Sequence, residues 1–255
     1  MMNPINNYFP VYNSEELKKI RKSSQISAFV LKELIKNIKP GVTPIELEQR
    51  ARRLIKVRGC EPAFLGYNGY EFATCISVNN AVVHGLPDSR KIKESDLIGI
   101  DLGVKYDGYY SDCAVTVPVG KISNEAQKLL RITKKALNEA VKIIKPKIHL
   151  GDVEYTIEKI LSVEGLGIVK DLTGHGVGKS LHEGPSIRNY GKSGSGPLLQ
   201  EGNVLAIEPM ATLGDGNIKV DGSGWTVLTR DDTTSAQFEY TVEVTRTGCR
   251  ILTQW

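Results

Sequence analysis

One stretch of the chain recurs 106 residues further on (144 minus 38), and this repeat constrains the fold more than any other feature. Segment 38–48 aligns with segment 144–154, with proline on proline and acid on acid. Such a period is too long for a solenoid, whose repeats span about 20 to 50 residues. We therefore expect one domain with two similar halves, over residues 1–255, split approximately into 14–120 and 121–255. The alternative is that two helix pairs merely share common capping residues.

Each half is expected to start with a long helix and a shorter capped helix. The first helix begins near Asn13 or Ser14 and keeps apolar residues at helical spacing through Ile38. The second begins at 43–46, where a threonine N-cap, a proline and a glutamate form a capping box, and it is closed by Gly59. His149 takes the position of the threonine in the second half.

Apolar, β-branched runs follow both helix pairs and predict strands. Asp107–Gly108 between two of them is a hairpin signal, and a turn there brings Asp101 and Asp112 almost opposite each other. Helices followed by antiparallel strands, twice over, indicate an α+β fold with helices covering one face of a curved sheet. The predicted strands lie within 73–83, 97–104, 109–119, 204–207, 225–228 and 238–245.

Composition removes several functional classes. The formal charge of +4 on 255 residues is too small to indicate nucleic-acid binding, so we expect no nucleic-acid substrate. No run approaches the roughly 18 apolar residues of a membrane span, and the start lacks a secretory leader. The four cysteines form no CxxC pair, which predicts reduced thiols and a cytoplasmic protein. The basic runs 18–22 and 50–58 are interpreted as solvated helix faces, with a transient ribosome contact as the alternative.

The chemistry is concentrated in a few histidines and acids. His175 and His182 lie in a glycine-rich stretch, where a single histidine would usually be structural. Asp101, Glu208 and Glu239 lie inside otherwise apolar runs, and a buried carboxylate needs a cation or donors. Together with Asp112 and a histidine, these acids indicate a shared metal cluster.

The order and spacing of seven such residues resemble the active-site series of the type I methionine aminopeptidases. The similarity extends through the segments 65–70, 75–79, 83–88, 221–227 and 235–239, and thus over nearly the whole chain. The resemblance implies the pita-bread fold of the creatinase and aminopeptidase group, with two pseudo-symmetric halves around a dinuclear metal site. The seven residues are His84, Asp101, Asp112, His175, His182, Glu208 and Glu239.

In that family the matching positions imply five metal ligands for two divalent ions. His175 and Glu208 would bind one ion, Asp101 the other, and Asp112 and Glu239 both. This mostly oxygen donor set suits Mn²⁺, Fe²⁺ or Co²⁺ as well as Zn²⁺. The resemblance further implies hydrolysis by a water that the two ions activate. The expected catalytic residues are Glu208, which relays the proton, His182, which donates to the carbonyl oxygen, and His84, which contacts the scissile amide.

The resemblance also implies a pocket for a methionine side chain. Aromatic rings and a thiol form a soft apolar slot that suits a thioether. The family often has phenylalanine where this chain has Leu181, and a second acid where it has Gly184, which puts the shape of the slot and its entrance in question. The expected pocket residues are Phe64, Tyr67, Tyr70, Cys75, Leu181 and Trp225, with His84 and His182 also contacting the substrate.

The expected function is removal of the initiator methionine from nascent chains and peptides whose second residue is small, by a monomeric enzyme. An Xaa-Pro aminopeptidase or dipeptidase would carry an additional N-terminal domain, for which about 13 residues leave no room. A type II methionine aminopeptidase would need an inserted subdomain between Glu208 and Glu239. A binding module on the same fold would be expected to have lost ligands, and all five are present.

Overall fold

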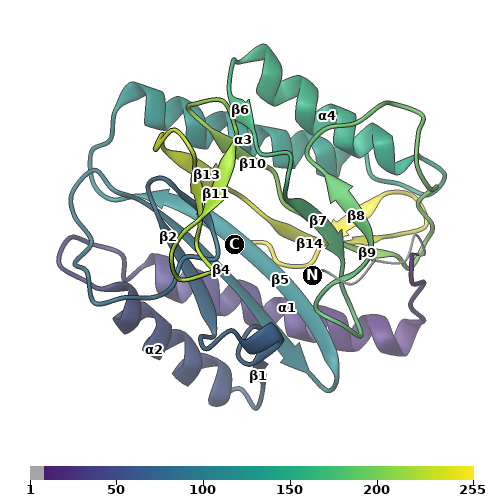
Figure 1. The fold of residues 1–255 in the computed structure, drawn as a ribbon. Coiled ribbons are helices and arrows are strands. Elements are labelled where there is room, and N and C mark those ends of the chain that lie inside the picture. Colours follow the sequence, from purple (N-terminus) through teal and green to yellow (C-terminus); the bar gives the residue numbers. More distant parts are fainter. Residues whose placement is uncertain (1–8) are drawn as a thin grey trace.

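The computed structural model describes residues 9–255, which form four α-helices and a set of short and long strands (Figure 1). In the described residues, no helix is both long enough and apolar enough to cross a membrane. A single 3₁₀ turn, η1 (Tyr67–Gly69), interrupts the strands of the first half. The helices are α1 (Ser14–Ile35), α2 (Pro44–Lys56), α3 (Asn124–Lys142) and α4 (Leu150–Val163).

All strand pairs in this part of the chain are antiparallel, and they form four sheets. One sheet consists of β1 (Glu61–Pro62), β4 (Leu97–Tyr106), β2 (Thr74–Val78) and β5 (Tyr109–Pro118). The largest contains β15 (Cys249–Ile251), β14 (Tyr240–Val244), β9 (Val204–Ile207), β7 (Thr173–Gly176) and β8 (Glu183–Arg188). The two small sheets contain β13 (Ser235–Gln237), β10 (Met210–Thr212) and β6 (Gly167–Ile168), and β11 (Ile218–Val220), β12 (Val227–Thr229) and β3 (Ala81–Val83).

The predicted helix pairs are confirmed, and the second helix of each pair keeps the repeat. Helices α2 and α4 begin at Pro44 and Leu150, which are 106 residues apart (150 minus 44). Thr43 and Glu46 form the predicted capping box, and the Asp152 carboxylate accepts the backbone N–H of the N-cap His149. The first helices of the two halves, α1 and α3, begin at 14 and 124, so their separation exceeds the repeat of 106 residues by four.

The predicted end of the first helix is wrong by one turn. Helix α1 ends at Ile35 and does not reach Ile38. The N–H groups of Asn37 and Ile38 bond to carbonyls three residues back, which tightens the chain out of the α-helix. Pro40 further disfavours helical geometry at the residue before it.

The helices form two layers with the strands between them. In Figure 1, α1 and α2 lie along the lower side of the molecule and α3 and α4 along the upper side. Helix α1 packs on β4 and β5, whereas α3 packs on β10 and β13. One continuous apolar core includes residues of all four helices, such as Leu31, Ala51, Leu137 and Ile157. The two halves therefore share one core, as an α+β architecture requires.

The hairpin at Asp107–Gly108 is confirmed, and it brings its two acids almost opposite each other, as predicted. Both turn residues have positive φ, which a two-residue hairpin turn needs. The turn pairs Tyr106 with Tyr109, so the hairpin is centred one residue later than the acids would require. Asp112 consequently faces Gly103, and Asp101 faces Ala114. The two acids are diagonal neighbours, and since side chains alternate with period two, both remain on one face of the sheet.

A hydrogen-bonded seam joins β5 of the first half to the last part of the chain. The Thr241 hydroxyl donates to the Asp112 carbonyl at 2.7 Å and accepts the Asp112 N–H at 3.0 Å. Two residues further along, Glu239 N–H donates to the Ala114 carbonyl at 2.9 Å. Because the two halves have no continuous ladder here, these few bonds set their relative register at the acids.

Helix α1 is attached to the sheet by buried serines as well as by apolar contacts. The Ser111 hydroxyl lies 2.8 Å from that of Ser23 and 2.7 Å from that of Ser27. Ser23 also donates to the Val104 carbonyl at 2.6 Å. All three serines are fully buried, so each hydroxyl depends on the others for its hydrogen bonds.

We expect Ser111→Ala to destabilise the protein by about 1–3 kcal/mol, because it leaves buried serine hydroxyls short of a partner. The melting temperature should then be lower by roughly 3–10 °C. Ser162→Ala is the matched control, since Ser162 is an exposed residue of α4. Equal melting temperatures for the two variants would contradict the role given to the serine cluster.

Candidate metal centre

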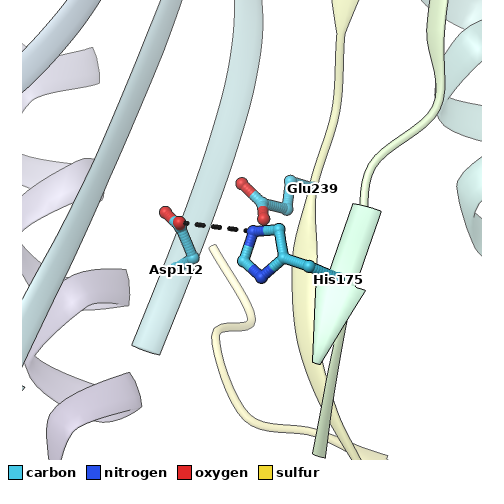
Figure 2. A group of neighbouring side chains, drawn as sticks. All are labelled: Asp112, His175 and Glu239. Atoms are coloured by element: carbon cyan, nitrogen blue, oxygen red, sulfur yellow. Dashed lines mark ion pairs between the residues drawn. The ribbon is translucent and has the colours of Figure 1, made fainter. Parts of the chain in front are cut away.

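The acids and histidines singled out from the sequence come together between the two halves. Asp112 on β5, His175 on β7 and Glu239 offer ligand atoms within 4.8 Å of one another, and all three are buried (Figure 2). His175 Nε2 lies 3.9 Å from Asp112 Oδ2 and 3.7 Å from Glu208 Oε1. Asp101 on β4 is within hydrogen-bonding reach of Asp112. The cluster thus contains all five expected ligands.

Glu208 and Glu239 do not lie inside strands, contrary to expectation. Glu208 lies between β9 and β10, and Glu239 between β13 and β14. Each junction is a point where the chain leaves one sheet and enters another. Pro209 has no N–H for a ladder, which favours the break after Glu208. The junctions let both carboxylates turn into the space between the halves.

Burial dominates the electrostatics of the acids. Loss of solvent raises the pKa of Asp101 to about 7. Burial, and then repulsion by neighbouring carboxylates, raises the pKa values of Asp112, Glu208 and Glu239 well above the usual range. Among residues 9–255, no lysine or arginine forms an ion pair with any of the four. Four carboxylates without a protein cation are costly to bury.

His175 adds a lone pair to this group of buried acids. Burial lowers its pKa to about 4, so the ring is neutral at neutral pH. Its Nδ1 lies 2.9 Å from the Gly176 carbonyl oxygen, which can only accept, and the proton of the neutral ring is therefore on Nδ1. The lone pair of Nε2 then faces the carboxylate oxygens of Asp112 and Glu208. Such an arrangement is repulsive unless a cation lies between these atoms.

Two carboxylate oxygens of the cluster are buried without a hydrogen-bond partner, namely Asp101 Oδ1 and Glu239 Oε1. Buried polar atoms are rarely left unpaired in folded proteins, so these two need a ligand. Oxygen donors with one imidazole nitrogen form a donor set suited to divalent ions. The residues present therefore fit a metal centre.

His182 and His84 lie beside the cluster. The rings of His182 and His175 are 4.3 Å apart between centroids. Burial lowers the pKa of His182 to about 2, with further contributions from the nearby His175 and His84. Burial also lowers the pKa of His84, which has a positive φ of 56° directly after β3. Non-glycine residues with a positive φ are strained, and they are concentrated at functional sites.

The turn after His84 depends on glycine. A Cβ at Gly85 would lie 2.3 Å from the Ile76 carbonyl oxygen, where no side chain fits. Gly85 instead accepts the Ile76 N–H through its own carbonyl and donates to Ser77 Oγ. This close approach to β2 holds the backbone beside His84.

A buried apolar cluster adjoins the acids, where the sequence predicts the methionine slot. It is formed by buried residues around Cys75, whose Cα is paired with that of Asp101 across β2 and β4. The Trp225 ring packs edge-on against Tyr70 at 5.0 Å and lies in a turn before β12, not in a strand as expected. The buried members are Ala63, Phe64, Tyr70, Cys75 and Leu181, with Trp225 packed on them.

Tyr67 is not part of that buried cluster. Its side chain is 37% exposed, and its hydroxyl lies 2.8 Å from His182 Nδ1. Tyr67 was expected in the slot with the other aromatic residues, yet it contacts the histidine. The left-handed backbone at Gly66, Asn68 and Gly69 turns the chain at this point, so that residue 67 leaves the apolar cluster.

Gln237 was not predicted as a site residue. Its Nε2 donates to Glu208 Oε2 at 3.0 Å, and its side chain is also within hydrogen-bonding reach of Asp101. The signal available in the sequence was its position two residues before Glu239 in a buried strand, which puts both on one face. A polar residue at such a position is expected to orient its neighbours.

The model of Metallopeptidase family M24 matches residues 18–246. The chain belongs to this family. Methionine aminopeptidase 1 of Bacillus subtilis is 44% identical over 239 residues, covering 94% of this chain and 96% of that one. The crystal structure of methionine aminopeptidase from Thermotoga maritima superposes with a TM-score of 0.96 at 42% identity, covering 97% and 100%. Prolidase from Pyrococcus furiosus superposes with a TM-score of 0.78 at 27% identity, covering 96% of this chain and 65% of that one.

Membership of M24 confirms the pita-bread fold and makes the chain a metallopeptidase that uses divalent metal. The resemblance to the methionine aminopeptidases is confirmed as well, over nearly the whole chain. The role of each residue is inferred from the geometry described above.

Metal should stabilise the protein, and Asp112→Asn should remove that effect. At a divalent ion concentration about 100 times its Kd, binding adds about 2.7 kcal/mol, or roughly 5–11 °C in melting temperature. The asparagine keeps an oxygen that can accept the Cys113 N–H, and it removes one of four mutually repelling charges. The metal-free variant should therefore melt no lower than the metal-free parent.

The matched control is Glu154→Gln, which changes a buried carboxylate of α4 outside the cluster. It should retain the shift on adding metal. The parent and both variants are each measured metal-stripped and reloaded, and scanning calorimetry gives the six melting temperatures. An equal metal-induced shift in Asp112→Asn and the parent would refute the assignment of Asp112.

Proposed function

We propose that the chain is a methionine aminopeptidase that removes the initiator methionine from nascent proteins and peptides with a small second residue. One observation carries the proposal, namely the buried apolar cluster around Cys75, which is paired with Asp101 of the metal-site acids. A thioether side chain held against these residues would bring the first peptide bond of a substrate beside the acids. The functions named for the Bacillus and Thermotoga relatives support the same reaction.

Two divalent ions, Mn, Fe, Co or Zn, would be held by Asp101, Asp112, His175, Glu208 and Glu239. When bound, such ions lower the pKa of water and stabilise negative charge on a carbonyl oxygen. The lone pair of His175 Nε2 and the unpaired oxygens of Asp101 and Glu239 support this assignment. Four carboxylates formally balance two divalent ions.

Glu208 would accept the proton of the attacking water and pass it to the leaving amine. Gln237 donates to its Oε2, which leaves Oε1 for the water. In the cluster this oxygen lies 3.7 Å from His175 Nε2. A general base must lie within hydrogen-bonding reach of the proton that it abstracts, and Oε1 is turned toward the centre where the water would be held.

His182 would donate a hydrogen bond to the carbonyl oxygen of the scissile bond. Because burial keeps the ring neutral, it carries one proton. When the Tyr67 hydroxyl donates to Nδ1, this proton is on Nε2 and is available to the substrate. Hydrogen bonds that strengthen as charge develops on the oxygen lower the barrier. His84, which lies near enough to contribute to the lowered pKa of His182, would contact the scissile amide.

The remaining assignments concern the whole chain. We propose one catalytic domain with halves 14–120 and 121–255, supported by the shared core and the repeat of α2 and α4. A cytoplasmic monomer acting on nascent chains follows from the proposed substrate, and a transient ribosome contact is compatible with the basic faces of α1 and α2. The alternative of an Xaa-Pro peptidase has weaker support, because the prolidase superposes less closely.

Metal-stripped protein reloaded with Mn²⁺, Co²⁺, Fe²⁺ or Zn²⁺ should release methionine from Met-Ala-Ser. Met-Leu-Ser should be cleaved at least about tenfold more slowly, since a branched second residue meets the walls of the site. Free amino acids are quantified by chromatography. Cleavage of Ala-Pro-Ala alone would replace the proposal with the Xaa-Pro alternative, and no cleavage with any metal would favour a binding module.

His182→Ala should lower kcat for Met-Ala-Ser by about 10² to 10³, the usual loss for one donor to a developing oxyanion. Metal content should stay that of the parent, because His182 is not among the proposed ligands. His149→Ala, at the start of α4, is the control histidine and should keep kcat. Loss of metal from His182→Ala, measured by atomic emission after dialysis, would contradict the role given to this residue.

A further inference from the structure

The loop between β7 and β8, residues 177–182, carries two residues of the proposed site. Leu181 is buried in the apolar cluster around Cys75, and the next residue, His182, contacts Tyr67. The opposite side of this loop packs against Tyr12, which precedes the N-cap Asn13 of α1. Neither the sequence pattern nor the family resemblance pointed to this contact.

Tyr12 is only 5% exposed, and its hydroxyl is engaged on both sides. It donates to Glu183 Oε2 at 2.5 Å and accepts the Lys179 N–H at 3.0 Å. Glu183 Oε1 accepts the Ser180 N–H at 2.8 Å. One phenol and one carboxylate therefore pair two backbone N–H groups of the loop, and hydrogen bonds to a carboxylate are the stronger kind.

The contact with Tyr12 also leaves no room for a side chain at residue 178 of the loop. A Cβ at Gly178 would lie 2.1 Å from the Tyr12 hydroxyl oxygen and 2.3 Å from Cζ, so only glycine allows this approach. The Gly178 carbonyl accepts the Tyr110 N–H at 2.7 Å. Lys179, whose side chain is largely exposed, is paired with the half-buried Glu16 of α1 at 2.6 Å. The start of the loop is thus held by the N-terminal segment and α1.

We propose that Tyr12 and Glu183 are positioning residues, which hold loop 177–182 so that His182 faces the substrate and Leu181 closes the slot. The inference rests on the proposed function. Neither residue belongs to the metal cluster, and their hydrogen bonds are to each other and to the loop. A displacement of about 1 Å at a catalytic group can lower a rate about 100-fold, so the loop backbone must be held closely.

Tyr12→Phe keeps the ring and removes the bridge between Glu183 and Lys179. We expect about a tenfold lower kcat for Met-Ala-Ser, with the metal content of the parent and a melting temperature lower by no more than about 4 °C, because about one hydrogen bond is lost. Tyr155→Phe is the matched control. Tyr155 is 42% exposed on α4, and its hydroxyl makes no hydrogen bond within residues 9–255.

Two readouts separate positioning from a general loss of structure. Amide hydrogen exchange in the metal-free protein should accelerate about tenfold over residues 178–182 in Tyr12→Phe, while β9 and β14 keep their protection. In a His182→Ala background, Tyr12→Phe should lower kcat much less than tenfold, because the part of its effect that acts through the His182 ring is absent.

Unchanged exchange in the loop would overturn the inference, and so would a tenfold loss of kcat that persists in the His182→Ala background. Uniform acceleration over the whole chain would also overturn it, since the bridge would then serve overall stability. An inactive parent would instead refute the proposed function, and the exchange experiment on the metal-free protein would still test the loop. The two failures are therefore distinguishable.

Discussion

The structure depends on the burial of like charges at its centre. Four carboxylates and the lone pair of a neutral imidazole are removed from water without a lysine or arginine beside them in the described chain. Burial of this kind is unfavourable unless a cation of another origin compensates it. The fold holds the donors in place by the seam between Asp112 and Thr241 and by sheet junctions at Glu208 and Glu239. A divalent metal centre compensates the free-energy cost of burying these carboxylates and this lone pair.

The same burial accounts for the chemistry of the histidines. A buried imidazole away from cations loses its charge, and the pKa values of His175 and His182 are accordingly low. Neutral rings can act as a ligand through one nitrogen and as a donor through the other. The Gly176 carbonyl fixes the proton of His175 on Nδ1, and the Tyr67 hydroxyl contacts Nδ1 of His182. One apolar environment thus keeps both rings neutral, as the two different roles proposed for them require.

Local features were predicted well because their causes are local. The capping box of Thr43 and Glu46 and the turn at Asp107–Gly108 depend on residues within four positions of each other. The end of α1 was misplaced, since it depends on competition between the last helical turn and the tighter turn before Pro40. The metal-ligand set was proposed from the order of the residues and a family resemblance, and the structure brings all five together. The departures at Leu181 and Gly184 lie on or directly after the loop that Tyr12 contacts.

The sequence by itself determined the caps, the strand-forming runs, the repeat of α2 and α4, and the identity of the charged residues in apolar surroundings. Each follows from the spacing of residue types along the chain. Only the tertiary structure decided that Tyr67 contacts His182, that Gln237 orients Glu208, and that Tyr12 reaches Glu183 across 171 positions. These contacts join residues far apart in the chain, and a phenol or an amide has the same local pattern whether it packs in a core or bonds to a distant partner. Their partners are set by how the two halves pack, which no local spacing specifies.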